Sequence, residues 1–217
     1  RFFGSTSIGF NGSGTYNFPN LIIDGVVFMN NQGSGVSCDS LTILSGDLNF
    51  VNQSCAINVR GNWRNAGGKF THTGGIVNLV SNTSTIKYIT SNKETFGQLR
   101  IDPANGGSCD YYLLDDLQCV WDGAGNNSSF ILTGANSQTV NFHINSKTFS
   151  VNNVQIACAN AANNTQFIAN GGSVIRIGSG YTFTTAASAR PLIAFRGVAD
   201  RRVLVTRQGN GTYTFNL

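Results

Sequence analysis

The 217-residue sequence has few charged residues, only three prolines and almost none of the residues that favour helices. Charged residues make up 11% of the chain, against about 25% in a typical soluble domain. It contains one Met and one Glu, so strong helix formers are scarce and a helical domain is not expected. The hydrophobic content of 41% is nevertheless enough to build a core, which excludes a disordered linker.

Other signals are also missing. No apolar run approaches the roughly 18 residues that a membrane-spanning helix needs. The cysteines form no CxxC pair, and His72 and His143 stand apart, so no zinc site is expected. No Walker, dinucleotide-binding or G-x-S-x-G motif occurs. The sequence therefore predicts no cofactor, no metal ion and no catalytic residue.

The net charge of +4 is too small to indicate nucleic-acid binding. The positive charge is nevertheless concentrated near the C-terminus. We interpret this as a solvated end of the chain, with a docking face for an acidic partner or polysaccharide as the alternative. The residues concerned are Arg190, Arg196, Arg201, Arg202 and Arg207.

Instead of charge, the chain is rich in Gly, Asn, Ser and Thr, and most of its strand candidates are three to six residues long. Examples are residues 41–44, 48–51 and 56–59, with Gly, Asn, Ser or Asp between them. Only residues 186–190 are suited to a helical turn. Short strands at close intervals leave a sandwich, a barrel or a solenoid as candidates.

Two short units recur along the chain. The first, F-x-[N/Q]-L-x-I-D, occurs at Phe18–Asp24 and Phe96–Asp102, with a truncated echo at Gly211–Leu217. The second occurs at Phe70–Leu79 and Phe167–Ile177, which share a Phe, a Gly-Gly pair and a following Val. Their alternating order and irregular spacing predict a degenerate solenoid with coils of roughly 20–25 residues.

The stretch from Gly61 to Val80 contains the first copy of the second unit. We predict that its two Gly pairs form corners between successive strands. Phe70, Val77 and Leu79 are expected to point into a stacked core.

Four phrases stand out within this pattern: GDLNF at 46–50, INVRGNWRNAGGKFTHTGGIVNLV at 57–80, ETFGQLRID at 94–102 and LLDDLQCV at 113–120. Together they resemble large bacterial cell-surface repeat proteins, over roughly residues 8–180. The resemblance implies a right-handed parallel β-helix that is secreted, displayed at a surface, and adhesive or filament-forming. It carries no catalytic motif.

We therefore predict an all-β fold, a right-handed parallel β-helix (β-solenoid) with degenerate repeats and a C-terminal cap. A β-sandwich is the alternative. Residues 1–182 would form the solenoid. Residues 183–217, with longer strands and more charge, would form a cap or the closing strands of the same domain.

The candidates for an active site are Asp110, Asp115 and Asp116, with Asp122 nearby. Parallel β-helix enzymes that cleave polysaccharides use close carboxylates as acid and base or as calcium ligands. Asp115 and Asp116 lie between two strand candidates, so we interpret them as turn residues that accept backbone hydrogen bonds. A polysaccharide lyase or glycoside hydrolase remains the alternative function.

Three aromatic residues near turns, Trp63, Tyr111 (or its neighbour Tyr112) and Trp121, are the candidates for stacking on sugar rings. The alternative is that they cover the edges of coils.

The five cysteines allow two local disulfides, Cys38–Cys55 and Cys109–Cys119, which leave Cys158 unpaired. The alternative is a set of buried free thiols in a stacked core.

Asn-x-Ser/Thr sequons fit a secreted, glycosylated surface. They begin at Asn11, Asn52, Asn82, Asn126, Asn127, Asn163 and Asn210. Because the chain starts with neither Met nor a signal peptide, we expect a mature or excised part of a larger protein.

The predicted function is an extracellular structural or adhesive module, either a self-assembling surface or filament subunit or a carbohydrate-binding adhesin. Its expected partners are further copies of itself, joined through strand edges at the ends, or a surface polysaccharide. No nucleic acid and no membrane span are expected.

Overall fold

The fold is all-β. The computed structural model describes residues 1–11, 15–32, 35–81, 83–103, 108–121, 128–134, 139–158, 164–178, 182–185, 192–208 and 214–216. Strands and turns account for these residues. No helix capable of crossing a membrane is found among them.

The chain begins with three long strands that lie side by side. These are β1 (Phe2–Asn11), β2 (Thr15–Gln32) and β3 (Gly35–Phe50). β1 pairs with β2 and β2 with β3, both in parallel. β3 in turn pairs with three separate short strands, β4, β5 and β6, so one long strand covers the length of a whole later coil.

From β4 onwards each coil is divided into three short strands, and equivalent strands stack in parallel to form three faces. Face 1 consists of β4 (Ala56–Val59), β7 (Ile76–Leu79), β10 (Gln98–Ile101), β13 (Phe130–Gly134), β16 (Val154–Cys158), β19 (Thr182–Thr185) and β22 (Thr214–Asn216). Face 2 consists of β5 (Trp63–Asn65), β8 (Ile86–Thr90), β11 (Cys109–Leu113), β14 (Thr139–His143), β17 (Asn164–Asn170) and β20 (Leu192–Arg196). Face 3 consists of β6 (Lys69–His72), β9 (Thr95–Phe96), β12 (Leu117–Cys119), β15 (Thr148–Val151), β18 (Val174–Gly178) and β21 (Leu204–Gln208).

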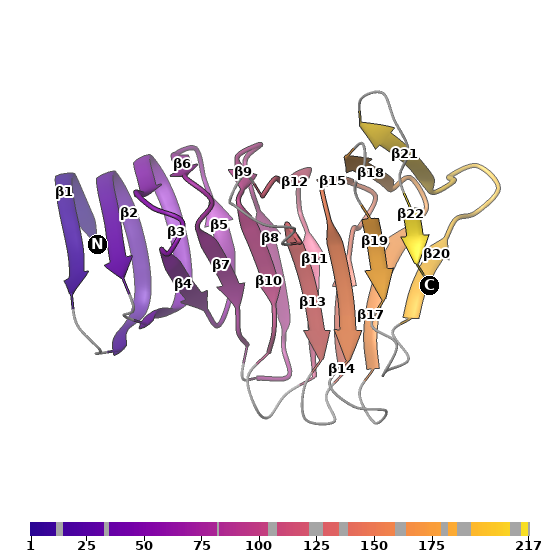
Figure 1. Cartoon of the computed structure of the whole chain (residues 1–217), viewed down its shortest axis with the longest axis horizontal. Helices are drawn as coiled ribbons and strands as arrows, with labels where there is room; N and C mark the ends of the chain where they lie inside the picture. The colour runs from indigo at the N-terminus through magenta and orange to yellow at the C-terminus, as the bar shows by residue number, and fades with distance from the viewer. Residues whose placement is uncertain are drawn as a thin grey trace.

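This arrangement is the predicted parallel β-solenoid. Figure 1 shows the coils stacked along the long axis, with the two termini at opposite ends and face 3 along the top. The strand pairs of all three faces are parallel, whereas a sandwich is built from antiparallel strands. The sandwich alternative is therefore wrong.

The core is a set of columns in which apolar residues of successive coils stand one above another. On face 1, Ile57, Val77, Leu99, Phe130 and Val154 are aligned in register, and each is at most 1% exposed. Alternate residues of a strand point to opposite sides, so one column of this kind fixes which residues of every coil face outward.

Aromatic rings fill the later coils. Phe130, Phe142, Phe149 and Phe167 come from faces 1, 2 and 3 and are fully buried. Their ring centroids lie 4.8 to 6.4 Å apart, within the range of favourable aromatic pairs. These rings therefore join the three faces across the interior.

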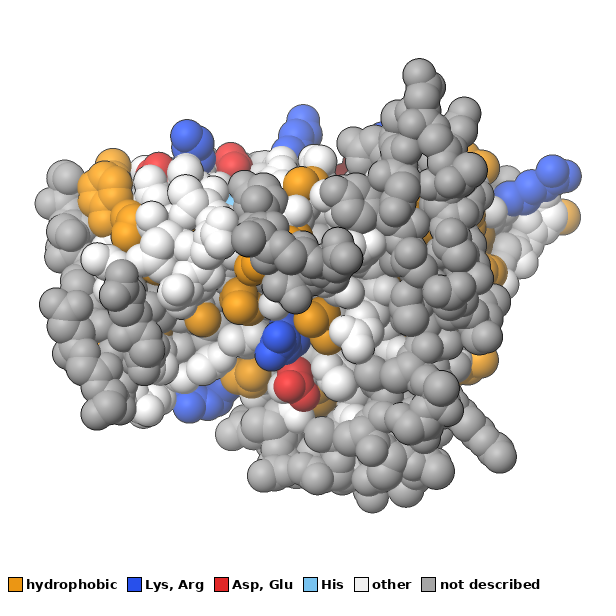
Figure 2. Space-filling view, in the orientation of Figure 1, with side chains coloured by type: hydrophobic (Ala, Val, Ile, Leu, Met, Phe, Trp, Pro, Cys, Tyr) orange, Lys and Arg blue, Asp and Glu red, His pale blue; other side chains and the backbone are white. Residues whose placement is uncertain are grey.

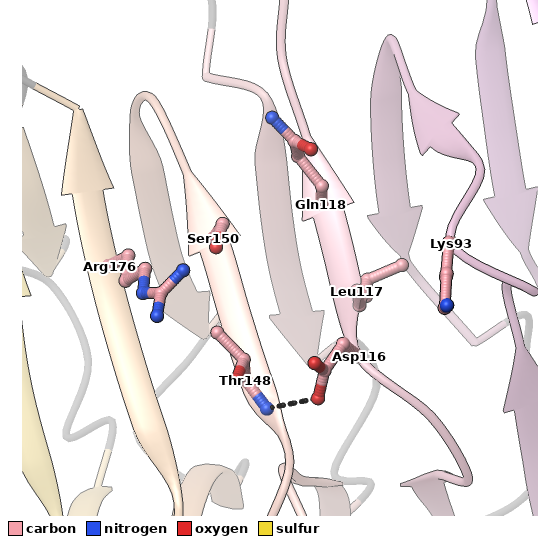
Figure 3. Close-up of a pocket in the computed structure, with 7 residues that line it drawn as sticks. All are labelled: Lys93, Asp116, Leu117, Gln118, Thr148, Ser150 and Arg176. Carbon is pink, nitrogen blue, oxygen red and sulfur yellow. Dashed lines mark hydrogen bonds between the residues drawn. The ribbon is translucent and has the colours of Figure 1, made fainter. Parts of the chain in front are cut away.

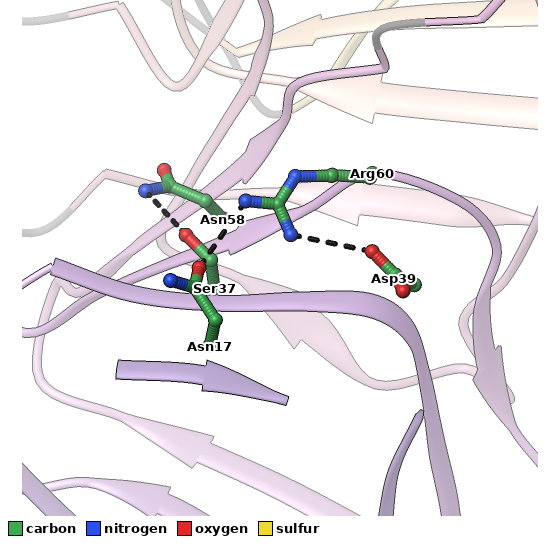
Figure 4. A network of polar contacts seen from close by, with 5 residues as sticks. All are labelled: Asn17, Ser37, Asp39, Asn58 and Arg60. Carbon is green, nitrogen blue, oxygen red and sulfur yellow. Dashed lines mark hydrogen bonds and ion pairs between the residues drawn. The ribbon is translucent and has the colours of Figure 1, made fainter. Parts of the chain in front are cut away.

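Uncharged polar side chains form the corresponding columns on the outside. On face 1 the Nδ2 of Asn78 donates to Asn58 Oδ1 at 3.0 Å, and Asn58 Nδ2 donates to Ser37 Oγ at 3.4 Å. At the adjoining corner, Arg60 reaches Asn17 and Asp39, both at 3.2 Å (Figure 4). The high Asn, Ser and Thr content thus supplies hydrogen bonds between coils. Among the residues that are coloured in Figure 2, white atoms predominate and the blue and red charged side chains are scattered between them.

One corner of the first coils requires glycine. Gly4, Gly25 and Gly46 are in register on β1, β2 and β3. A Cβ atom on Gly25 would lie 2.3 Å from the carbonyl oxygen of Gly4, and Gly46 has a φ of +74°. Neither position can accept a side chain without moving the backbone.

The length of a coil agrees with the prediction at first and then increases. The aligned residues Ile57, Val77 and Leu99 are 20 and 22 positions apart (77 − 57 and 99 − 77), but Leu99 and Phe130 are 31 apart (130 − 99). The longer coil includes residues 122–127, which lie outside the described part of the chain.

The recurring units are not the coil repeat. In the first copy of the F-x-[N/Q]-L-x-I-D unit, Leu21 is aligned with Leu41 and Trp63 of face 2. In the second copy, Leu99 lies on face 1. The two copies therefore lie on different faces of the solenoid. The same pattern of residues fits both faces.

The stretch from Gly61 to Val80 behaves as predicted. It contains β5, β6 and β7, with a Gly pair at each of the two corners between them. Phe70, Val77 and Leu79 are buried. The later copy departs from it, because Ile175 and Ile177 are the buried residues of β18 rather than Val174.

The last described strands continue the stack. β19, β20, β21 and β22 each pair in parallel with a strand of the preceding coil, as closing strands of the solenoid would. Between β20 and β21, Val198 and Arg201 exchange backbone hydrogen bonds of 3.0 Å. The Arg201 guanidinium donates to Ser146 Oγ at 2.8 Å, which fastens this turn to an earlier corner.

Both expected disulfides are wrong. Cys38, Cys55, Cys109 and Cys119 are buried free thiols. Cys38 is aligned with Val59 of the next coil, four residues beyond Cys55. Four strand residues span about 13 Å, and the Cα atoms of a disulfide lie within about 7 Å.

The second pair is separated by a corner. Cys109 lies on face 2 and is aligned with Val140, whereas Cys119 lies on face 3 and is aligned with Phe96 and Val151. The side chain of Cys158 lies outside the described residues.

Burial should make these thiols unreactive. Desolvation raises the pKa of Cys38 to about 12 and that of Cys109 to about 11, and it also raises the pKa of Cys119. At pH 8 the three therefore remain protonated, whereas an exposed cysteine is partly thiolate. We expect native protein to react with iodoacetamide at these positions about 100-fold more slowly than urea-unfolded protein. Peptide mass spectrometry checks this, and equal labelling in both states would contradict the structure.

Removing one ring from the aromatic core should cost most of the stability of a typical domain. Phe142→Ala is expected to lower the free energy of unfolding by about 3–5 kcal/mol, measured by urea denaturation followed by circular dichroism. Phe195 on β20 is 47% exposed, so Phe195→Ala, the same chemical change, should cost about 0.5 kcal/mol. Equal losses for the two variants would be inconsistent with the described core.

Candidate functional site

Two of the three predicted sugar-stacking residues are buried. Trp63 is 1% exposed and Tyr111 0%, so neither can present a ring to a ligand. Trp63 occupies an inward position aligned with Leu41 and Ile89. Its ring lies 5.1 Å from that of Phe96, and it is a core residue.

Tyr111 also points inward, and its hydroxyl accepts a hydrogen bond from the backbone N–H of Ser81 at 3.2 Å. Desolvation raises its pKa. Trp121, the third candidate, is half-buried. Its indole nitrogen Nε1 is buried and meets no acceptor in the described part of the chain. Trp63 and Tyr111 therefore cannot form the predicted sugar-stacking site, whereas Tyr112, the alternative to Tyr111, points outward.

The structure instead gathers aromatic rings on the outside of face 2. Tyr88 of β8, Tyr112 of β11 and His143 of β14 are aligned in register on three successive coils. The rings of Tyr112 and His143 are stacked, with centroids 4.1 Å apart and planes 3° from parallel. The ring of Tyr88, which is 41% exposed, lies 6.4 Å from that of Tyr112. We call these three residues the aromatic row.

A polar group fixes one end of the aromatic row. The Oδ1 atom of Asp110 lies 2.9 Å from His143 Nε2 and accepts a hydrogen bond of 2.8 Å from Asn141 Nδ2. Asp110 is aligned with Asn141 on one side and with Ile86, which is 52% exposed, on the other. The imidazole ring is therefore held flat against Tyr112 by its bond to the carboxylate.

The phenol of Tyr112 remains a hydrogen-bond donor at neutral pH. Desolvation, followed by the nearby charges of Asp110 and Tyr88, raises its pKa. The aromatic row thus combines ring faces with a phenol, a carboxylate and an amide within two strand positions. Ring faces contact apolar surface, and a few polar groups at their edge fix the orientation of a ligand.

The corner carboxylates serve the fold. Asp115 Oδ1 accepts a hydrogen bond from the backbone N–H of Ser91 at 2.7 Å, and its Oδ2 accepts one from Asn92. Asp116 Oδ1 accepts one from the backbone N–H of Thr148 at 2.8 Å. Both residues therefore satisfy backbone groups of neighbouring coils, as the turn interpretation predicts. Asp122 lies outside the described residues.

The histidines are separate. His72 Nδ1 accepts a hydrogen bond from the backbone N–H of Gly74 at 3.2 Å, within a corner. His143 belongs to the aromatic row. In the stretches that the structure describes, no group of three His, Cys, Asp or Glu side chains is placed to hold a metal ion.

Most sequons fall outside what can be described. The residues concerned are Asn82, Asn126, Asn127, Asn163 and Asn210, together with the side chain of Asn11. Asn52 is described, and its amide is engaged. Its Nδ2 donates to Asn30 Oδ1 at 2.8 Å, and its Oδ1 accepts from the backbone N–H of Ser54 at 2.9 Å. A glycan on Asn52 would replace an N–H of the amide that now bonds to the neighbouring coil.

The C-terminal arginines are only partly described. Arg196, Arg201 and Arg202 are exposed, which agrees with a solvated end. Arg190 and the side chain of Arg207 lie outside the described part of the chain.

Comparison with known proteins assigns no relative. No protein-family model matches the chain, and neither the curated proteins nor the solved structures contain a significant match. The resemblance to bacterial cell-surface repeat proteins therefore extends to the fold, a parallel β-solenoid, and membership of that family stays a prediction.

Proposed function

We propose that the chain is an extracellular structural and adhesive β-solenoid module that binds polysaccharide along the aromatic row of face 2. The observation that carries this proposal is the in-register alignment of Tyr88, Tyr112 and His143 on face 2. Tyr88 is 41% exposed and Tyr112 is half-buried, whereas His143 is buried at 9% and supports the ring of Tyr112. Neighbouring parallel strands are about 4.8 Å apart, so the rings repeat along the axis of the stack. The faces of Tyr112 and His143 lie against each other, and the ring of Tyr88 is the most exposed of the three. An extended glycan offers a repeating surface of C–H groups and hydroxyls that can follow such a row.

The chemistry of the row suits a sugar better than a peptide or nucleic acid. Its floor is aromatic, its edge is formed by a neutral phenol, an amide and one carboxylate, and sugar hydroxyls can donate to or accept from each of these. The row and its edge contain no Lys or Arg, the residues that bind the phosphates of a nucleic-acid backbone.

Removing the two tyrosines should abolish most of the binding. We expect wild-type protein to be retained by at least one member of a panel of cellulose, chitin, xylan, mannan and dextran. Each stacked ring contributes about 0.5–1.5 kcal/mol, so Tyr88→Ala combined with Tyr112→Ala should weaken affinity about 5- to 100-fold. Affinity electrophoresis or isothermal titration calorimetry provides the measurement.

Phe3, which is 60% exposed in the first coil, gives the matched control, because Phe3→Ala removes an exposed ring remote from the row. This control should bind as wild type does. Retention of full affinity by the double tyrosine variant would rule out the row as the binding surface. Failure of the wild type to bind any of the five polysaccharides would overturn the proposed function itself.

The terminal coils favour a second function, assembly of copies head to tail. In the described structure β1 pairs only with β2, and β20, β21 and β22 each pair with one strand. Their other edges can accept a strand of another chain. Exposed apolar side chains gather there, namely Leu192, Phe195, Val198 and Leu204.

Charge also differs between the two ends. Residues 1–50 contain one Arg and three Asp, a net charge of −2 (1 − 3), whereas residues 192–217 contain four Arg and one Asp, a net charge of +3 (4 − 1). Opposite ends of two copies would therefore attract each other. A contact between unlike ends does not close on itself and produces a filament.

A lysine on the terminal edge should block this assembly. Light scattering and electron micrographs of the 217-residue chain are expected to show concentration-dependent oligomers or filaments. Leu204→Lys on β21 should shift the population to monomer, because a charged residue on an edge strand opposes pairing. Ile86→Lys is the control, since Ile86 is similarly exposed on face 2 (52% against 56%) but distant from both ends. A monomeric wild type at high concentration would contradict the assembly proposal.

A further inference from the structure

A hollow of about 220 Å³ lies on the outside of face 3, where β12, β15 and β18 are neighbours (Figure 3). Its origin is a difference in side-chain size within one row. Gln118, Ser150 and Arg176 are aligned in register on the three strands, and the short Ser150 leaves a depression between two long side chains. Thr148 and Asp116 line its lower part.

The donors around this hollow have no partner among the residues that the structure describes. Within the described residues, neither the Arg176 guanidinium nor the Lys93 ammonium nor the Gln118 amide makes a hydrogen bond or ion pair. In Figure 3 the Arg176 side chain points towards Ser150 and Thr148, and Lys93 stands on the opposite side beyond Leu117. Two cations therefore flank a floor of hydroxyl groups.

The carboxylates of the same region are already engaged. Asp116 accepts a hydrogen bond from the backbone N–H of Thr148, and Asp115 accepts hydrogen bonds from the backbone N–H groups of Ser91 and Asn92. A second hollow of about 370 Å³ shares Lys93 and Asp116 with the first and adds Lys147. The region thus contains three cationic groups without partners in the described structure, while both corner carboxylates are held by amides.

We propose that the face 3 hollow binds a carboxylate-bearing sugar unit of an acidic polysaccharide. A guanidinium can hold a carboxylate through two parallel hydrogen bonds, which assigns the acid group to Arg176. The Gln118 amide and the hydroxyls of Ser150 and Thr148 then face the sugar hydroxyls. The hollow is smaller than the roughly 300–1,000 Å³ of sites for drug-sized ligands, so it accommodates one sugar unit rather than an oligosaccharide.

This inference rests on the proposed glycan-binding function and adds the class of glycan. Tyr112 is the middle residue of the aromatic row, and Asp116, which lines the hollow, follows it by four residues in the chain, across the corner that contains Leu114. Leu114 is 46% exposed and lines the second hollow. One chain of sugars can therefore contact the outward tyrosine rings of face 2 and place an acidic unit on face 3.

The test compares acidic polysaccharides with the same polymers after chemical reduction of their carboxyl groups. The probes are polygalacturonate, alginate and hyaluronan, measured by isothermal titration calorimetry with the full 217-residue chain. Wild-type protein should bind at least one acidic polymer about tenfold or more tightly than its reduced form. Arg176→Gln should remove this preference and leave the affinity for the reduced polymer unchanged.

Arg202→Gln provides the control, because Arg202 is exposed elsewhere and its loss changes the net charge equally. It should keep the preference for the acidic form. Equal losses for Arg176→Gln and Arg202→Gln would indicate general charge attraction and overturn the inference. The same holds if no acidic polymer is preferred. Binding of neutral polymers that depends on Tyr88 and Tyr112 would then leave the proposed function intact, and binding of no polymer at all would overturn both.

Thermal denaturation of each variant confirms that it is folded. Ser150→Gln offers a second route, because it fills the hollow with a longer polar side chain while Arg176 is kept. This variant should also lose the preference for the acidic polymer, and a retained preference would contradict the assignment of the hollow.

Discussion

Each coil of this solenoid depends on its neighbours for the hydrogen bonds of its backbone. The short strands of one coil do not pair with each other along a face; they pair with the equivalent strands above and below. Because buried backbone groups must be bonded, the register between coils is fixed along the whole stack. The register then determines which residues form the interior columns and which residues form the outer rows.

This constraint explains the unusual composition. Outward rows need side chains that bond to the same position one coil away, and Asn, Ser and Thr do so at distances near 3 Å, as Asn78 and Asn58 do. At the corners, Asp115 and Asp116 bond to backbone groups of adjacent coils. Charged pairs contribute little at a surface, so a fold that satisfies its polar groups by stacking has little need of them.

The sequence predicted the architecture but not the positions of the functional side chains. Alternation in Cys109–Leu113 places residues 109, 111 and 113 on one side. This signal could have assigned Tyr111 to the core and Tyr112 to the surface, but the prediction named Tyr111, with Tyr112 as its alternative, as a sugar-stacking residue. On β8 the side chains also alternate, but polarity does not follow the alternation, because Lys87 takes an inward position and Ile86 and Tyr88 the outward ones. Lys87 is buried, and its ammonium group is satisfied by hydrogen bonds to Thr83 Oγ1 at 3.0 Å and to Thr85 Oγ1, contacts that the alternation pattern does not reveal.

Spacing along the chain misled in a related way. Cys38 and Cys55 are near in sequence, and the two F-x-[N/Q]-L-x-I-D units look like equivalent parts of a coil, yet register places the cysteines far apart and the units on different faces. Because the three faces are built from similar residues, the same short unit can occur on any of them and does not indicate the length of a coil. The register therefore had to come from the strand pairing, because the coil length changes from 20 to 31 residues.

The division between inward and outward rows also bears on how binding surfaces arise in such a fold. Substitution of an outward residue leaves the interior columns unchanged, so a face can gain rings or cations at little cost to stability. A row of such residues is repeated at the spacing of the coils, about 4.8 Å, and its length is set by how many coils share the residue type.

Tyr88, Tyr112 and His143 occupy three coils in this way, and Gln118, Ser150 and Arg176 occupy three coils on the adjacent face. Because one corner separates the two rows, a ligand that is linear and repetitive matches both, whereas a compact ligand can match only one.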